Sequence, residues 1–311
     1  MNNLMFNLTN TSKQYIADAK KSPKYYTQQP DEVRAARAQC TKPLLDLPLL
    51  NQIIDRKIPV RDGSEISVRI YTPNGKGPFP IIVYYHGGGW VFGNLETADA
   101  GCHLLATEAN AIVVSVDYRL APEYKFPTPL YDAFDALLWV YEFAAELHGD
   151  STNIVVAGDS AGGNLATVVT HMAKEQNGPL ITAQALIYPV TNMDMTTNSY
   201  ENYAHDLGLD RDGMSWFGEH YVNNEEDYRN SAVSPLLQDD LSYLPRAIII
   251  AAEYDVLFDE GASYACRLKE AGVPCHHVVM PGLIHSYFSK MEFFEEETRK
   301  TVQLIADFIK K

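Results

Sequence analysis

The 311-residue sequence predicts an α/β fold built on a mostly parallel sheet. Short apolar runs rich in β-branched residues alternate with longer helical stretches, as expected when each strand is followed by a covering helix. These runs are unbroken rather than alternating, which is typical of strands that are buried on both faces. The length suits one large domain with insertions.

The elements follow one another in a regular order. Two strands around a tight turn at Asp62-Gly63 open the pattern, within residues 53–72. The later predicted strands are 81–85, 112–116, 154–157, 185–188, 247–250 and 277–280. The predicted helices are 97–109, 128–147, 161–176, 258–271 and 291–310.

Two regions depart from this order. Residues 1 to about 50 are polar, with scattered apolar positions that suggest short amphipathic helices. Residues 192–240 contain no convincing strand and are rich in Asn, Asp, Tyr and Met. An insertion of this length between two strands is usually a lid or a binding loop.

The charge and hydropathy of the chain exclude several classes of partner. A formal net charge of −15 repels phosphate backbones and anionic lipid headgroups, so we expect no nucleic-acid partner and no electrostatic docking on membranes. No stretch approaches the roughly 18 apolar residues of a membrane span. Residues Met1 to Asn10 lack a basic region and a long apolar run, so we expect no signal peptide and a cytoplasmic protein.

Neither the cysteines nor the histidines form a recognisable metal motif. The cysteines are Cys40, Cys102, Cys266 and Cys275, and they contain no C-x-x-C pair. The run Cys275-His276-His277 lies in a predicted strand, where neighbouring side chains point to opposite faces. We therefore expect reduced cysteines and no metal.

A serine in a glycine-flanked turn is the first candidate for chemistry. The run Gly158-Asp159-Ser160-Ala161-Gly162 matches G-x-S-x-G and lies between a predicted strand and a predicted helix. Side chains two residues before and after Ser160 would collide in so tight a turn, so glycines are needed there. We expect a strained Ser160 backbone, with the hydroxyl at a helix N-terminus. Without its context, a turn of no chemical role would explain the pentapeptide equally well.

A glycine trio follows the predicted strand 81–85, in the run His86-Gly87-Gly88-Gly89-Trp90. Its backbone amides, together with that of Ala161, could hold the oxyanion of an acyl-transfer reaction. The alternatives are a flexible linker or a phosphate cradle. The sequence contains neither of the usual phosphate-binding glycine patterns.

These motifs together resemble a known family. His86 to Trp90, the run Asp117-Tyr-Arg-Leu-Ala-Pro-Glu123 and Gly158 to Gly163 are similar to those of the hormone-sensitive-lipase-like branch of the α/β hydrolases, from about residue 55 onward. The resemblance implies the α/β-hydrolase fold, with an eight-stranded, mostly parallel sheet and helices on both faces. It also implies a helical cap, formed by residues 1–50 and by an insertion at about 192–240 of the catalytic domain 51–311.

The resemblance assigns roles within the glycine loop as well. It implies that Gly88 and Gly89 donate to the oxyanion and that Gly87 serves the turn. His86 would fix the loop by hydrogen bonds, and the segment around Glu123 would buttress it.

The remaining catalytic candidates follow from the chain order of this fold, which is nucleophile, acid, base. Asp255 follows a predicted strand and aligns with the acid of the family pattern Asp-Pro-Leu-x-Asp-Glu-Gly, with Val256 in place of proline. Asp259 and Glu260 are expected to begin the next helix, where acidic side chains favour the dipole. His285 fits the base because it lies in a loop after the last predicted strand. The other histidines fall in that strand (His276, His277), on predicted helices (His103, His148, His171) or in the insertion (His205, His220).

Ser160, Asp255 and His285 together predict a serine carboxylesterase that cleaves short-chain acyl esters and needs no cofactor. An amidase or deacetylase with the same residues is one alternative. Another is a ligand-binding receptor without catalysis, similar to the plant gibberellin receptors, which lack the histidine. A further hypothesis is that the protein forms a homodimer. Several aromatic residues are candidates either for pocket walls or for the cap core: Trp90, Phe92, Tyr188, Tyr203, Trp216 and Phe217.

Overall fold

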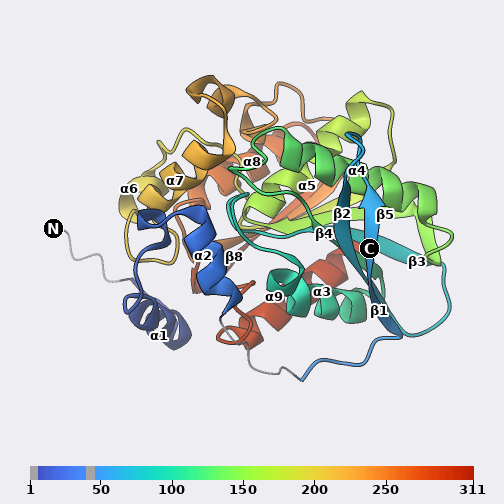
Figure 1. Ribbon diagram of the computed structural model, residues 1–311, viewed down its shortest axis with the longest axis horizontal. Helices are drawn as coiled ribbons and strands as arrows, with labels where there is room; N and C mark the ends of the chain where they lie inside the picture. The colour runs from blue at the N-terminus through green and yellow to red at the C-terminus, as the bar shows by residue number, and fades with distance from the viewer. Residues whose placement is uncertain (1–5, 40–45) are drawn as a thin grey trace.

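The computed structural model describes residues 6–39 and 46–311, and one eight-stranded sheet runs through these residues (Figure 1). The strands are β1 (Gln52–Pro59), β2 (Glu65–Thr72), β3 (Phe79–Tyr85), β4 (Ile112–Asp117), β5 (Gly149–Asp159), β6 (Ile181–Ile187), β7 (Arg246–Tyr254) and β8 (Cys275–Ile284). The helices that cover the sheet are α3 (Leu95–Ala109), α4 (Thr128–Phe143), α5 (Ala161–Glu175), α8 (Phe258–Glu270) and α9 (Glu295–Ile309). Further helical segments are α1 (Asn10–Ala19), η1 (Tyr25–Thr27), α2 (Pro30–Ala38), α6 (Asn198–Asn202), α7 (Arg211–Tyr221), η2 (Glu225–Arg229) and η3 (Pro235–Leu237).

The sheet has the order β1-β2-β4-β3-β5-β6-β7-β8. The strand β2 runs antiparallel to β1 and to β4, and the pairs from β4 through β8 are parallel. Parallel strands place their carboxyl ends at one edge of the sheet, which is where α/β folds bind ligands. The predicted fold class, with a mostly parallel eight-stranded sheet, is confirmed.

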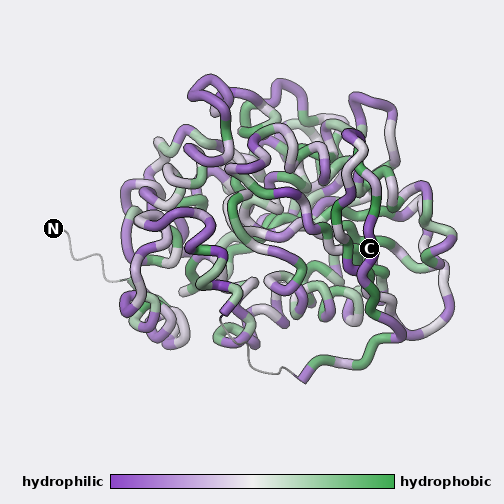
Figure 2. Tube along the Cα trace, in the orientation of Figure 1, coloured by the Kyte–Doolittle hydropathy of each residue, from purple (hydrophilic) through white to green (hydrophobic). Residues whose placement is uncertain are grey.

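Alternate side chains of each central strand enter hydrophobic clusters on opposite faces of the sheet. In β3, Ile81 and Val83 belong to the cluster that also contains residues of α4, α5 and α8, whereas Ile82 and Tyr84 belong to the cluster that contains residues of α3 and α9. Figure 2 shows the central strands as largely hydrophobic and the outer loops as largely hydrophilic. Burial on both faces explains why the strand sequences are unbroken apolar runs.

The element boundaries differ from the sequence prediction in a few places. The strand β5 begins at Gly149 rather than at residue 154, because polar residues 150–153 extend the strand without an apolar signal. The helix α4 ends at Phe143, and His148 lies in the following turn with a backbone φ of 61°. His148 is therefore not on a helix, contrary to the prediction. The helix α9 begins at Glu295, where three successive glutamates favour the positive end of the helix dipole.

The N-terminal segment lies beside the insertion between β6 and β7. Figure 1 shows α1, α2, α6 and α7 at the same end of the molecule, where η1 contacts α7. Asp210, at the N-terminus of α7, accepts hydrogen bonds from Lys24 Nζ at 2.7 Å and from Tyr26 Oη at 2.8 Å. At the start of α1, Ser12 Oγ donates to the carbonyl of Gly282 at 2.9 Å. The parts of the predicted 1–50 segment at 1–5 and 40–45, including Cys40, lie outside the described residues.

Along residues 6–39 and 46–311, none of the helices combines the length and the apolar character that crossing a membrane requires.

Candidate active site

Ser160 occupies a sharp turn between β5 and α5. Its backbone φ is 56°, a left-handed conformation that is strained for a residue with a side chain. A Cβ at Gly162 would run into the carbonyls of Tyr85 and His86, and one at Gly158 would run into the backbone of Gly162. Both flanking glycines are therefore required by close backbone approach, as the sequence predicts.

Ser160, His285 and Asp255 form a continuous chain of hydrogen bonds. The distance from His285 Nε2 to Ser160 Oγ is 2.9 Å, and that from His285 Nδ1 to Asp255 Oδ2 is 2.6 Å. All three residues are buried. The structure thus brings together three side chains that are far apart in the sequence, in the geometry that lets a hydroxyl give its proton to an imidazole.

The loop that carries Asp255 is held by the insertion. Asp255 Oδ1 accepts from the amide of Leu257 at 3.0 Å. The carbonyl of Val256, which stands where the family pattern has proline, accepts from Ser199 Oγ of α6 at 2.6 Å. Asp259 Oδ2 in turn accepts from the Ser199 amide at 2.8 Å. These bonds fix the loop between two separate parts of the chain.

Glu260 has a larger role than the expected start of a helix. It is fully buried, and its Oε1 accepts from the amides of Thr191 and Asn192 at 2.6 and 3.0 Å. These amides begin the insertion, so Glu260 fixes the insertion to α8. Burial raises the pKa of Glu260 well above its ordinary value. Sequence reasoning misses this role because the partners lie about seventy residues away.

The glycine loop has a backbone that only glycine adopts easily. The φ angles of Gly88 and Gly89 are 120° and 60°. A Cβ at Gly89 would collide with the ring of Phe217, and one at Gly88 with the carbonyl of Phe92. Within the described residues, the amides of Gly88 and Gly89 donate to no protein acceptor. They are therefore available to an anion.

Asp159 supports the glycine loop from below. Its Oδ1 accepts from the amide of Gly87 at 2.9 Å and from Tyr84 Oη at 2.7 Å. Burial raises the pKa of this carboxyl, although both hydrogen bonds favour the charged form. The sequence places Asp159 inside the serine motif but gives no sign of this contact.

His86 lies beneath the same loop, stacked on Tyr118. Their ring centres are 4.3 Å apart, and Tyr118 Oη donates to the His86 carbonyl at 2.7 Å. His86 Nδ1 lies 2.8 Å from the carbonyl of Gly87. Burial lowers the pKa of His86, because desolvation disfavours the charged form of the ring. These contacts are those of a supporting residue.

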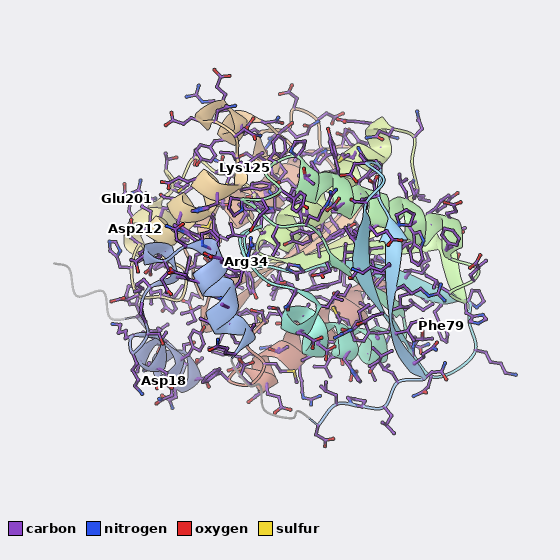
Figure 3. All side chains as sticks on the ribbon, viewed as in Figure 1. Asp18, Arg34, Phe79, Lys125, Glu201 and Asp212 are labelled. Atoms are coloured by element: carbon purple, nitrogen blue, oxygen red, sulfur yellow. The ribbon has the colours of Figure 1, made fainter. Side chains whose placement is uncertain are left out.

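The segment around Glu123 joins the glycine loop to the N-terminal helices. Arg34 of α2, labelled in Figure 3, donates to the carbonyls of Val91 and Ala121 and forms an ion pair with Glu123 at 2.8 Å. The amide of Ala121 donates to the Trp90 carbonyl at 2.9 Å. One arginine therefore connects a helix of the first forty residues with the loop over Ser160.

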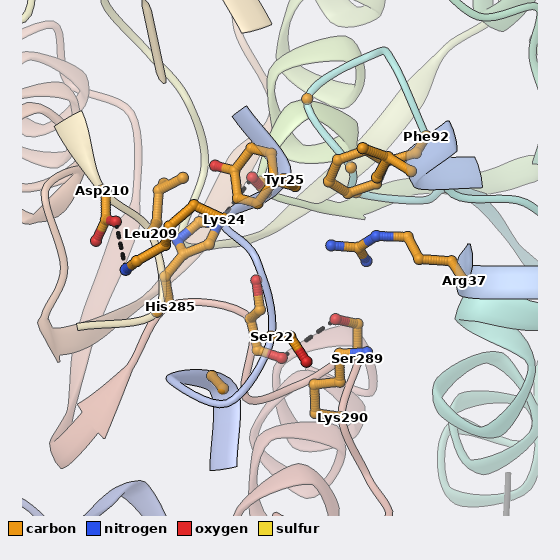
Figure 4. A pocket seen from close by; sticks show the side chains of 18 of the residues that line it. Ser22, Lys24, Tyr25, Arg37, Phe92, Leu209, Asp210, His285, Ser289 and Lys290 are labelled. Carbon is orange, nitrogen blue, oxygen red and sulfur yellow. Dashed lines mark hydrogen bonds and ion pairs between the residues drawn. The ribbon is translucent and has the colours of Figure 1, made fainter. Parts of the chain in front are cut away.

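A cavity of about 420 Å³ connects these groups (Figure 4). Gly88, Gly89, Ser160 and His285 line it together. Ala161 is fully buried and is not among the lining residues, although its amide directly follows Ser160 at the start of α5. The three proposed oxyanion donors thus come from two loops that meet at the serine.

A comparison with known proteins identifies the family. A family model described as "alpha/beta hydrolase fold" matches residues 82–289. The chain belongs to this α/β-hydrolase family. It is 38% identical over 257 residues to an arylesterase of Saccharolobus solfataricus, which covers 82% of this chain and 83% of the relative. It is 41% identical over 263 residues to a carboxylesterase of Mycobacterium tuberculosis, covering 83% of this chain and 82% of the relative.

Solved structures of similar proteins support the same assignment. An esterase of the archaeon Pyrobaculum calidifontis matches this hydrolase with a TM-score of 0.88 and 38% sequence identity, over 97% of this chain and 98% of that chain. The resemblance to the hormone-sensitive-lipase-like carboxylesterase branch is confirmed.

The aromatic residues of the hydrolase divide between cavity and core. Phe92 and Phe217 line the cavity, as the sequence allows. Tyr188 instead packs on His285, with ring centres 4.5 Å apart. The other candidates pack elsewhere and are not lining residues: Trp90, Tyr203 and Trp216.

The N-terminal segment of the hydrolase supplies lining residues that sequence reasoning missed. Tyr25 stacks on Phe217, with ring centres 5.2 Å apart, and lines the cavity. Arg37 of α2 also lines it. No sequence motif surrounds Tyr25 or Arg37. Their place in the cavity lining depends on how the N-terminal segment packs on the rest of the chain, which the sequence does not indicate.

No group of three or more His, Cys, Asp or Glu side chains suited to a metal ion occurs in the described part of the hydrolase. The thiols of Cys102, Cys266 and Cys275 are free.

Proposed function

We propose that this α/β hydrolase is a serine carboxylesterase that cleaves short-chain acyl esters, with Ser160, His285 and Asp255 as catalytic residues. The hydrogen-bonded chain from Ser160 through His285 to Asp255, at the floor of a cavity, is the observation that carries the proposal. The esterase relatives support the reaction class.

The roles follow from the geometry. His285 Nε2 takes the Ser160 proton as the hydroxyl oxygen attacks the ester carbonyl carbon. Asp255 holds Nδ1–H and stabilises the imidazolium that forms. The imidazolium then protonates the leaving alcohol, which departs from an acyl-enzyme. Water, deprotonated by His285, hydrolyses that ester and releases the acid, restoring Ser160.

The negative charge that develops on the carbonyl oxygen needs donors in place before the reaction. The amides of Gly88, Gly89 and Ala161 would supply them, each contributing about 3 kcal/mol in the transition state. Ser160 also precedes the first turn of α5, whose dipole favours negative charge at that end.

The N-terminal residues 1–50 and the insertion at about 192–240 would form a cap over this site. Residues of α1, η1 and α2 line the cavity opposite Ser160, together with Leu209 and Phe217 of the insertion. A cavity of about 420 Å³ lies in the range of small-molecule sites, which supports short acyl chains. A cytoplasmic location and a homodimer stay predictions from the sequence.

Removal of the Ser160 hydroxyl tests the proposal. In Ser160→Ala, kcat/KM for 4-nitrophenyl acetate should fall by about 10⁴-fold or more, because the acyl-enzyme cannot form. The control is Ser242→Ala, an exposed serine outside the cavity, which should retain wild-type turnover. Treatment with a diethyl phosphoryl inhibitor should label the Ser160 peptide, as detected by mass spectrometry. Unchanged turnover in Ser160→Ala would overturn the proposal.

The amidase alternative is separated by a second substrate. 4-Nitroacetanilide presents the same acetyl group on an amide nitrogen. An esterase should cleave it far more slowly than 4-nitrophenyl acetate, whereas comparable rates would favour an amidase.

A further inference from the structure

Ser199 of α6 connects the insertion to the loop that carries Asp255. Its side chain is buried, and α6 contacts α8, the helix that begins a few residues after Asp255. The role proposed for Asp255 requires its carboxylate to face His285. A residue that orients this loop therefore affects catalysis even if it lies outside the cavity.

The helices α6 and α8 cap each other through Ser199 and Asp259. Each of these residues is the second of its helix, where the backbone N–H has no acceptor within the helix. The Ser199 amide donates to Asp259 Oδ2 at 2.8 Å, and the Asp259 amide donates to Ser199 Oγ at 3.3 Å. These two bonds fix the start of one helix against the start of the other.

The Ser199 hydroxyl uses its full hydrogen-bonding capacity at this junction. A hydroxyl can donate one hydrogen bond and accept two. Its proton goes to the Val256 carbonyl at 2.6 Å, because a carbonyl oxygen can only accept. Thr197 Oγ1, which lies 2.9 Å from Ser199 Oγ, is then the donor in that pair, and the Asp259 amide is the second donor. These three partners leave the hydroxyl a single orientation.

The carbonyl that Ser199 binds belongs to the same peptide group that binds Asp255. The Val256 carbonyl and the Leu257 N–H form one planar unit, with the oxygen and the hydrogen on opposite sides. Ser199 Oγ donates to this oxygen, and the Leu257 N–H donates to Asp255 Oδ1 at 3.0 Å. The other carboxylate oxygen, Oδ2, lies 2.6 Å from His285 Nδ1. Rotation of the peptide plane would therefore break a bond that orients Asp255 toward His285.

Within the loop itself, few bonds hold this peptide group. Val256 stands where the family pattern has proline, so no ring fixes its φ angle. Among residues 6–39 and 46–311, the Val256 amide donates to no acceptor and no backbone amide donates to the Val256 carbonyl. The Asp255 carbonyl accepts from the Phe258 amide at 3.1 Å. The bond from Ser199 thus adds a restraint that comes from the insertion.

We propose that Ser199 is a positioning residue for catalysis, which orients the Asp255 carboxylate through the peptide group between Val256 and Leu257. Neither Ser199 nor Val256 lines the cavity, so this contribution does not involve contact with the substrate. The insertion would then have two roles, because it covers the cavity and also orients the catalytic acid. This role rests on the proposed esterase activity and adds a residue that acts through Asp255.

Threonine and valine at position 199 separate the hydroxyl from the packing. The two side chains have the same shape, but only threonine can donate to the Val256 carbonyl. Ser199→Val and Ser199→Ala should lower kcat for 4-nitrophenyl acetate about tenfold, whereas Ser199→Thr should retain most of it. KM should change by less than about twofold, because acylation and deacylation both use His285. Each kcat is expressed per active site titrated with the diethyl phosphoryl inhibitor, so a variant that folds only in part still gives a valid value.

Ser234→Ala is the matched control. Ser234 is a buried serine of the same insertion, and its Oγ accepts from the Met193 amide at 2.9 Å and donates to the Tyr228 carbonyl at 2.7 Å. Neither partner belongs to the Asp255 loop. Ser199→Ala and Ser234→Ala should both be less stable in urea unfolding, because each loses a buried hydroxyl with its hydrogen bonds. Only Ser199→Ala should lose kcat.

The rate of phosphorylation by the same inhibitor gives a second readout. This reaction needs His285 to activate Ser160 but involves no deacylation, so its rate should fall in Ser199→Val and stay at the wild-type value in Ser234→Ala. The proposed role is wrong if Ser199→Val and Ser199→Thr have equal kcat, if Ser234→Ala loses as much kcat as Ser199→Ala, or if only KM changes. Turnover that survives in Ser160→Ala refutes the esterase proposal, whereas wild-type kcat in the Ser199 variants refutes only this one.

Discussion

Single residues of the site differ in how far the sequence identifies them. Ser160, Asp255 and His285 can be selected because their chain order and their positions after strands are fixed by the fold. Asp159 and Glu260 cannot be selected in this way, because the structural role of a buried carboxylate depends on which backbone amides donate to it. Those amides belong to the glycine loop and to the start of the insertion.

The glycines around Ser160 give a prediction at this scale. Gly162→Ala should lower the free energy of unfolding by several kcal/mol or prevent folding, because the new Cβ meets the carbonyls of Tyr85 and His86. The matched control is Gly261→Ala in α8, where nothing lies within 4 Å of an added Cβ. That variant should be neutral or more stable by up to about 1 kcal/mol. Urea unfolding of both variants checks the contrast, and equal stability would contradict it.

At the scale of elements, the strands and covering helices follow closely from local pattern, and the cap does not. The apolar runs locate β3 through β8 because burial on both faces demands them. The first half of β5 is polar, so its own composition does not predict a strand. It becomes part of the sheet because it pairs with β3. Likewise, the docking of α1 depends on the bond from Ser12 to Gly282, and that of α2 on the bond from Arg34 to the Ala121 carbonyl.

The link between α8 and the insertion gives a second prediction. Glu260→Ala should lower the free energy of unfolding by about 2–4 kcal/mol, because the buried amides of Thr191 and Asn192 lose their acceptor. Glu260→Gln keeps an oxygen acceptor and should retain most of the stability. The comparison is made by urea unfolding. A smaller loss in Glu260→Ala than in Glu260→Gln would contradict this role.

The same residue predicts a pH dependence. Burial raises the pKa of Glu260 in the folded state above its pKa in the unfolded state. The protonated side chain therefore contributes its full stabilisation below the ordinary glutamate pKa. This contribution to the free energy of unfolding is lost as the pH rises toward the folded-state pKa. Glu260→Gln removes this loss. Its free energy of unfolding relative to wild type should therefore increase from about pH 4 to about pH 7. A constant difference across that range would count against a buried, titrating carboxyl.

At the scale of the whole molecule, charge controls behaviour in solution more than it controls the fold. The hydrolase carries a formal charge of −15 at pH 7, and its sequence pI is about 5.0. Repulsion between copies should keep it dispersed near neutral pH and vanish near pH 5. Turbidity measured across pH should therefore peak close to the pI, and added salt should have little effect there. A flat profile would show that another surface property governs association.

The bond between Ser12 and Gly282 has a consequence for the order of events on the ribosome. Its two partners are 270 residues apart, so the first helix leaves the ribosome long before its docking site exists. At typical elongation rates that interval is on the order of tens of seconds. The segment made first is thus among the last to settle. During synthesis, α1 therefore cannot dock on the sheet until almost the whole chain has left the ribosome.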